Sequence, residues 1–354
     1  DPEDAKDFDD AISFRIKEEN IYEIGIHIAD VGHYVEKESI LDKEAFNRAT
    51  SIYLVDRVVP MLPEILSNNV CSLRPQEEKY TFSAIFNINK KGEILKEWFG
   101  KSVIKSDKRF SYAEAQEIIE TKKGNIKKEI ALKNKEYKVS EKTVNAILVL
   151  NEIATTLREE RKKQGSINFN KKEIKFKLDS KKNPIEVIFK ENKEANKLIE
   201  EFMLLANKKV AELFKKLKKE PSVYRIHDVP DKEKLKALKT IVKEFGYNLD
   251  ITSRGGTSRT LNKLLNEVKG TREQNLIETL AIRSMSKAEY STQNIGHYGL
   301  GFKHYTHFTS PIRRYPDILV HRILNECLNK GKDQKQKGLS DRSKYCSERE
   351  AAAV

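Results

Sequence analysis

The 354-residue sequence is poor in the features that mark several protein classes. It has three cysteines, Cys71, Cys327 and Cys346, whose wide spacing fits neither a disulfide framework nor a zinc site. It has no run of 18 apolar residues, which excludes an ordinary transmembrane helix. No internal repeat is visible either. These absences favour a cytoplasmic globular protein, and we expect no membrane partner.

Charge, in contrast, is abundant and biased toward one sign. Lysine and arginine total 67 against 54 aspartates and glutamates, so the formal net charge is +13 and the pI is near 9.3. A basic excess favours a polyanionic partner such as nucleic acid. Lysine pairs such as Lys122-Lys123 also fit solvated surface, so composition alone leaves both interpretations open.

The densest acidic cluster lies in the first ten residues. Two carboxylates about 4 Å apart repel by roughly 4 kcal/mol at an effective dielectric near 20, so a folded protein holds such a cluster only near cations. Oxygen ligands of this kind suit Mg²⁺ or Mn²⁺. An EF-hand is excluded, because Ala11 stands where a loop starting at Asp7 needs a third oxygen ligand. A solvated acidic start to a strand is the alternative. The acidic residues are Asp1, Glu3, Asp4, Asp7, Asp9 and Asp10.

Hydrophobic periodicity predicts a mixture of strands and helices, an α+β chain. Alternation predicts strands over 12–16, 22–28, 80–88 and 93–99. The first strand would aim the neighbouring aspartates, and the segment 28–35 is expected to continue the sheet. A period near 3.6 predicts helices over 41–49, much of 112–161, 196–217, 232–245, 261–268 and 276–285.

A second informative segment is HFTSPIRRYPD at 307–317. Pro316 and Asp317 suit the first turn of a helix. Two arginines directly before a helix N-terminus make a good phosphate site, because fixed positive charge is combined with unpaired backbone N–H groups. The segment therefore favours an anionic substrate.

Both segments resemble motifs of one family. The order Asp-Pro-x-Asp-Ala-x-Asp-x-Asp-Asp-Ala at 1–11 and Thr-Ser-Pro-Ile-Arg-Arg-Tyr at 309–315 resemble those of the exoribonucleases that include ribonuclease II, ribonuclease R and the catalytic subunit of the eukaryotic exosome. EEFMLLAN at 200–207, YRIHD at 224–228 and MSKAEY at 285–290 are similar to family text as well. The resemblance spans nearly the whole chain, with motif text most like that of ribonuclease R.

The resemblance implies an α+β fold of the RNB type: a mixed, mostly antiparallel sheet surrounded by helices, with a channel leading to a buried metal site. It implies one catalytic RNB domain over 1–354, truncated at both ends and without the family's flanking cold-shock and S1 RNA-binding domains. The family places a further glutamate shortly after a segment like CSERE at 346–350. Here AAAV follows, so we expect that glutamate to be missing and leave the activity of the fragment open.

The same resemblance implies a metal site and a phosphate contact. Asp9 is expected to be the most critical catalytic residue, with Asp7 completing the site and Arg313 touching the scissile phosphate. The cofactor is expected to be Mg²⁺ or Mn²⁺. The metal ligands that the resemblance implies are Asp1, Asp7, Asp9 and Asp10.

RNA contacts are implied in the same way. Tyr53 and Phe169 are expected to stack on bases, which contributes roughly 1–3 kcal/mol per base. A core strand position is the alternative for Phe169. For Glu200 the alternative is a helix-surface carboxylate, with Glu201 as its neighbouring competitor. The full set of implied RNA-binding residues is Tyr53, Phe169, Glu200, Arg313 and Arg314.

The function that the resemblance implies is Mg²⁺-dependent, processive 3′→5′ hydrolysis of single-stranded RNA with a free 3′ end. The product would be nucleoside 5′-monophosphates and the enzyme a monomer. A non-catalytic RNA-binding scaffold of the same fold is one alternative, and the intact aspartates and Arg313 argue against it. A nuclease acting on DNA is the other, because no residue can be assigned to a 2′-hydroxyl from sequence.

Overall fold

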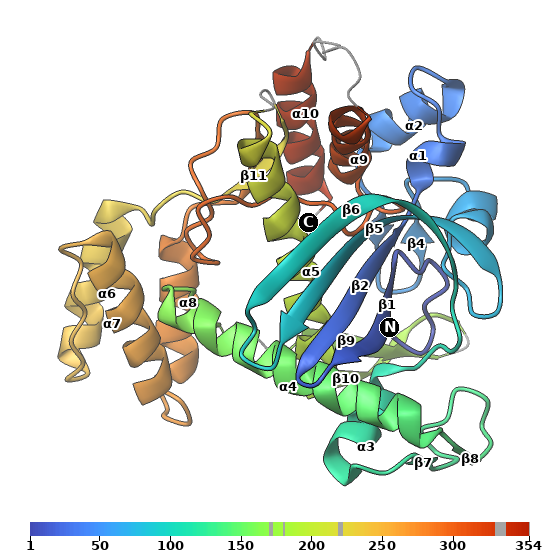
Figure 1. The fold of residues 1–354 in the computed structure, drawn as a ribbon. Coiled ribbons are helices and arrows are strands. Elements are labelled where there is room, and N and C mark those ends of the chain that lie inside the picture. The colour runs from blue at the N-terminus through green and yellow to red at the C-terminus, as the bar shows by residue number, and fades with distance from the viewer. Residues whose placement is uncertain (170–172, 180, 219–221, 330–337, 354) are drawn as a thin grey trace.

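The computed structural model describes residues 1–354 except 170–172, 180, 219–221, 330–337 and 354. A four-stranded antiparallel sheet in the order β1-β2-β5-β6 lies at its centre (Figure 1). The four strands that alternation predicts are confirmed, although β2 is buried on both faces from Ile24 to Ala29. They are β1 (Asp10–Glu18), β2 (Ile21–Ala29), β5 (Glu78–Asn89) and β6 (Ile94–Lys105).

One face of this sheet carries the main hydrophobic core. Ile26 and Ile28 of β2 and Phe82 of β5 are fully buried on it. Two long helices, α5 (Glu194–Lys216) and α9 (Tyr315–Leu328), contribute their apolar stripes to the same core. The mutual burial of these surfaces is what fixes the sheet against the helices.

The remaining elements connect and flank this centre. They are α1 (Val31–Tyr34), α2 (Ile40–Arg48), β3 (Ile52–Tyr53), β4 (Val58–Val59), the π-helical turn η1 (Leu66–Val70), α3 (Tyr112–Thr121), β7 (Asn125–Ile126), β8 (Tyr137–Lys138), α4 (Glu141–Lys163), β9 (Glu173–Leu178), β10 (Pro184–Lys190), β11 (Tyr224–Ile226), β12 (Glu289–Ser291) and α10 (Leu339–Ala352). The architecture is α+β, as the sequence predicts.

The prediction that 28–35 continues the sheet is wrong. The last ladder position of β2 is Ala29, and α1 begins at Val31. The backbone N–H of Asp30 still donates to the carbonyl of Tyr80 at 3.1 Å, but that of His33 already donates to the carbonyl of Asp30 at 3.0 Å. This local bond turns the chain away from the sheet.

Three helices form a second hydrophobic core. They are α6 (Lys232–Glu244), α7 (Arg254–Glu267) and α8 (Gln274–Ser284), and their buried residues include Leu238 and Leu261. Figure 1 shows them grouped on one side of the molecule, away from the four-stranded sheet. Among the described residues, no helix is both long and apolar enough to cross a membrane.

Candidate active site

The acidic segment 1–10 is fixed by contacts near both of its ends. Arg109 donates from Nη2 to two main-chain carbonyls of the segment, at 2.8 Å each. The same guanidinium lies 4.7 Å from the ring centroid of Phe8, which is buried. The backbone N–H of Phe8 donates to Ser72 Oγ at 3.0 Å. The aspartates therefore enter β1 from a tethered stretch of chain.

Asp9 joins the two ends of the sequence. Its Oδ1 accepts the backbone N–H of Ile312 at 2.8 Å, a contact across 303 positions, and its Oδ2 lies 3.5 Å from Arg313 Nε. Asp9 is only 4% exposed, whereas the side chain of Arg313 is 43% exposed. Burial raises the pKa of Asp9 to about 8, even though Arg313 and the bond from Ile312 act to lower it. A second cation beside Asp9 would favour its ionised form and so lower this pKa.

The neighbouring carboxylates share the same surroundings. Burial also raises the pKa of Asp10 at the start of β1. Asp7 Oδ2 accepts the hydroxyl of Tyr53 at 3.1 Å. Loss of solvent around Tyr53, followed by the charge of Asp7, raises the pKa of that phenol, although the residue is 54% exposed. Tyr53 thus lies beside the acidic segment with part of its ring accessible. Asp4 is exposed.

Tyr112 is a site residue that the sequence analysis missed. Its backbone N–H donates to the carbonyl of Asp1 at 3.1 Å. Burial raises the pKa of Tyr112 to about 12, and the charges of Asp10 and Glu200 also raise it, while Arg313 lowers it. Charges of both the acidic segment and α5 therefore act on its phenol. In the sequence it simply follows a helix N-cap, and nothing there distinguishes it.

Glu200 and Glu201, the two competing glutamates, have different surroundings, and the assignment of Glu200 to RNA stays a prediction. Glu201 is buried and forms an ion pair with Arg161. Glu200 is exposed, yet loss of solvent raises its pKa, and its charge acts on Tyr112. Of the two, Glu200 is the one whose charge acts on Tyr112.

Two predicted RNA-binding residues, Arg314 and Phe169, pack against other parts of the fold. Arg314 donates from Nη2 to Asp317 Oδ1 at 2.7 Å, and its side chain is only 16% exposed. Phe169 is half-buried against the second core. Within the described chain, its ring makes no aromatic contact with Tyr53. Stacking of a base between Tyr53 and Phe169 stays a prediction.

The donor set is compatible with Mg²⁺. Carboxylate oxygens are hard ligands, and Asp9 and Asp10 both have raised pKa values beside one arginine. In the described ranges, no group of three or more His, Cys, Asp or Glu side chains is placed so that it could hold a metal ion. Mg²⁺ does not require such a group, because it is usually held by one or two carboxylates, waters and substrate phosphates. The assignment of all four aspartates as ligands stays a prediction.

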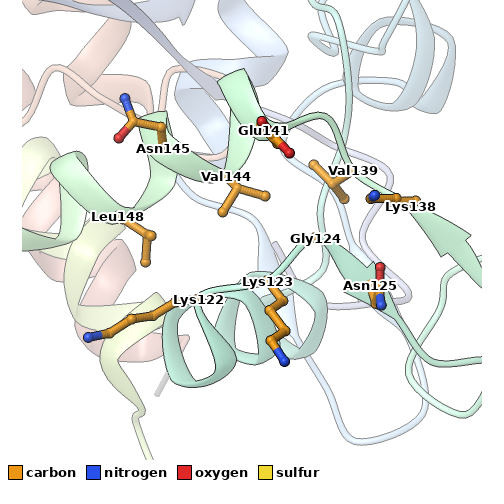
Figure 2. A pocket seen from close by; sticks show the side chains of 10 residues that line it. All are labelled: Lys122, Lys123, Gly124, Asn125, Lys138, Val139, Glu141, Val144, Asn145 and Leu148. Carbon is orange, nitrogen blue, oxygen red and sulfur yellow. The ribbon is translucent and has the colours of Figure 1, made fainter.

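Two cavities of the described structure lie elsewhere. One of about 360 Å³ lies between the end of α3 and the start of α4 (Figure 2), with Lys122 and Glu141 in its lining. The other, of about 610 Å³, is lined by residues such as Arg161 and Phe302. Neither includes an aspartate of segment 1–10, so chemistry rather than concavity identifies the candidate site.

Comparisons with known proteins find relatives that are similar over most of this chain. The chain is 41% identical to ribonuclease R of Thermotoga maritima over 362 residues, covering all of this chain and 49% of that protein. It is 36% identical over 337 residues to a protein of Arabidopsis thaliana named inactive exonuclease DIS3L2, covering 93% of this chain and 32% of that protein. The chain thus spans about half, or less, of the length of the curated relatives it matches.

A solved structure is similar over the whole chain. It is ribonuclease R of Mycoplasma genitalium in complex with ribose-methylated single-stranded RNA, with a TM-score of 0.88 and 31% identity, covering 100% of this chain and 54% of that one. The same protein has also been solved with double-stranded RNA. The model of the RNB domain matches residues 1–330. Fold, motifs and similarity agree, and the protein belongs to the RNB-domain family.

Proposed function

We propose that this chain is the catalytic part of a Mg²⁺-dependent 3′→5′ exoribonuclease that degrades single-stranded RNA processively to nucleoside 5′-monophosphates. One observation carries the proposal: Asp9 binds the backbone of Ile312 and lies beside Arg313. The acidic motif and the arginine motif thereby meet at one point. Such a point can receive both a cation and a phosphate.

The side chains of the site have separable tasks. In Arg313, Nη2 donates to Ser310 Oγ. The side chain is nevertheless partly exposed, so its other donors are available for a phosphate. Tyr53 offers an accessible ring on which a base can stack, and its hydroxyl fixes Asp7. Asp9 and Asp10 would hold Mg²⁺, which when bound supplies an activated water and neutralises phosphoryl charge.

Two other functions compete with this proposal. The inactive relative shows that a name in this family does not guarantee turnover, so a non-catalytic RNA-binding scaffold is the runner-up. The intact aspartates and Arg313 favour the enzyme over the scaffold. DNA as substrate is the second alternative. We propose RNA because the similar solved structure holds RNA.

The direct test follows the two ends of one RNA. In the intact protein with Mg²⁺, a 3′ label should be released at once as a mononucleotide, while a 5′ label should stay in progressively shorter fragments. Early release of the 5′ label as a mononucleotide would contradict the direction. Binding without any product would support the scaffold, and equal digestion of matched DNA would reject RNA specificity. We further propose that the enzyme acts as a cytoplasmic monomer, which sedimentation and fractionation would check.

A further inference from the structure

The turn before α9 has an inner side that the proposed reaction does not use. Asp317, in the first turn of α9, is fully buried. Its Oδ1 accepts the backbone N–H of Ser310 at 2.8 Å and Nη2 of Arg314 at 2.7 Å. One carboxylate oxygen thus bonds both ends of the turn 310–314.

The outer side of the same turn faces the acidic site. Ser310 Oγ accepts Nη2 of Arg313 at 3.0 Å, and the backbone N–H of Ile312 donates to Asp9 at 2.8 Å. The contacts therefore run from Asp317 through Ser310 to Arg313 and Asp9. The position of the phosphate-facing guanidinium depends on a residue that the substrate cannot reach.

We infer that Asp317 and Arg314 are a positioning pair that sets the turn 310–314, and that Arg314 is not a phosphate contact. This inference rests on the proposed function for its catalytic consequence. Arg314 differs from Arg313 in burial, with 16% of its side chain exposed against 43%. A guanidinium held at 2.7 Å by a fully buried carboxylate has its charge already compensated inside the fold.

The rest of the turn is tied to a different part of the chain. The backbone N–H of Ser51 donates to the carbonyl of Arg313 at 3.0 Å, and that of Tyr315 donates to the carbonyl of Ala49 at 2.9 Å. These bonds fix the end of the turn, whereas Asp317 fixes its beginning at Ser310. Removing the charge of Asp317 should therefore displace the beginning of the turn and leave α9 in place.

The first experiment uses Asp317→Asn in the intact protein, because asparagine keeps the size of the side chain but loses the charge that strengthens its bond from the Ser310 N–H and holds Arg314. We expect kcat to fall about 10²-fold, the cost of a misplacement near 1 Å, with KM for RNA within about twofold. The matched control is Asp42→Asn. Asp42 of α2 is buried and pairs at 2.8 Å with Arg322 of α9, the helix that also carries Asp317. That variant should lose stability but keep kcat.

The salt dependence of RNA binding separates positioning from contact. If Arg314 only positions, Arg314→Gln should leave the slope of log affinity against log salt unchanged. A direct phosphate contact would reduce that slope by about 0.7 for single-stranded RNA. A reduced slope, or wild-type kcat in Asp317→Asn, would overturn the inference.

The second experiment does not depend on activity. Amide hydrogen exchange should accelerate at Ser310 in Asp317→Ala, because its acceptor is gone. The inference further predicts faster exchange at Ile312, whose bond goes to Asp9 and not to Asp317. Acceleration at Ser310 alone would show that the pair is only a local structural contact. If the wild type degrades no RNA, the proposed function fails, and this exchange measurement still decides whether the pair sets the turn.

Discussion

Carboxylates in this protein are found in two contrasting settings. In several places an acid meets a close arginine, for example Asp42 with Arg322 at 2.8 Å, Glu350 with Arg225 at 2.6 Å, and Glu201 with Arg161. At the candidate site Asp9 lies 3.5 Å from Arg313, and Asp7 and Asp10 share the surroundings of the same arginine. The matched pairs hold the fold together. The carboxylates of the candidate site are unmatched in the sense that Asp7, Asp9 and Asp10 share one arginine, which leaves room for a further cation.

The sharpest test of this contrast, with the largest expected effect, is Asp9→Asn. Turnover should fall by about 10²-fold or more, because asparagine removes a carboxylate that would hold Mg²⁺, and even groups that only support metal ligands contribute about 10–100-fold. RNA affinity should change little, because binding depends on stacking and basic residues. Single-turnover kinetics and a binding titration measure the two effects. Wild-type turnover would remove Asp9 from the site.

The same variant should not weaken the fold. In metal-free protein the raised pKa of Asp9, about 8, means that the native state binds a proton more tightly than the unfolded state. Stability from this group is thus lost as pH rises from about 4 to 8, and asparagine removes that loss. Thermal melts in EDTA at pH 8 should give Asp9→Asn a melting temperature at or above wild type. Asp42→Asn should melt lower, and the opposite ranking would contradict the contrast.

Arg313→Ala should have the next largest effect. Turnover should fall by about 10²–10³-fold, because the phosphate charge that Arg313 faces grows in the transition state. The salt slope of RNA binding should fall by about 0.7, the value of one phosphate contact. Arg313→Lys keeps the charge but loses the planar fork, so only part of the turnover should return. Full activity in the lysine variant would show that charge alone is sufficient.

Tyr53 should show a smaller effect that divides into two parts. Tyr53→Ala removes the ring and should weaken RNA binding by about 1–3 kcal/mol. Tyr53→Phe keeps the ring but loses the hydroxyl that donates to Asp7, so binding should be retained and turnover should fall modestly. Fluorescence anisotropy with a short single-stranded RNA measures affinity. If phenylalanine loses as much binding as alanine, stacking is not the role of this residue.

The smallest effect on catalysis is expected at His27, a buried polar group matched by hydroxyls. Its ring nitrogens bond Ser83 at 2.7 Å and Ser13 at 2.8 Å, and burial lowers its pKa to about 4. Below pH 6.5 the unfolded state gains a proton that the folded state does not, so stability should fall between pH 6.5 and 4. Denaturant titrations should show a shallower fall in His27→Gln. An unchanged pH profile would argue against a neutral buried imidazole.

Sequence periodicity was sufficient where burial follows a simple repeat. It located the strands of the central sheet because alternate residues such as Ile26 and Phe82 face one core. It was insufficient at 28–35, where local hydrogen bonding turned the chain. The resemblance placed both Arg313 and Arg314 among the RNA-binding residues, and only the fold shows that Arg314 is largely buried. Tyr112 joins the site through a backbone contact with Asp1, which no local pattern reports.

The unmatched carboxylates should form a cation site at the meeting point of the two motifs. The most direct measurement is the anomalous signal of Mn²⁺ in crystals of the intact protein with a single-stranded RNA. We predict a peak about 2.1 Å from carboxylate oxygens of Asp9 or Asp10, with an RNA phosphate between the ion and Arg313. A Mn²⁺ ion bound elsewhere, with the RNA 3′ end ordered beside a metal-free Asp9, would contradict the account.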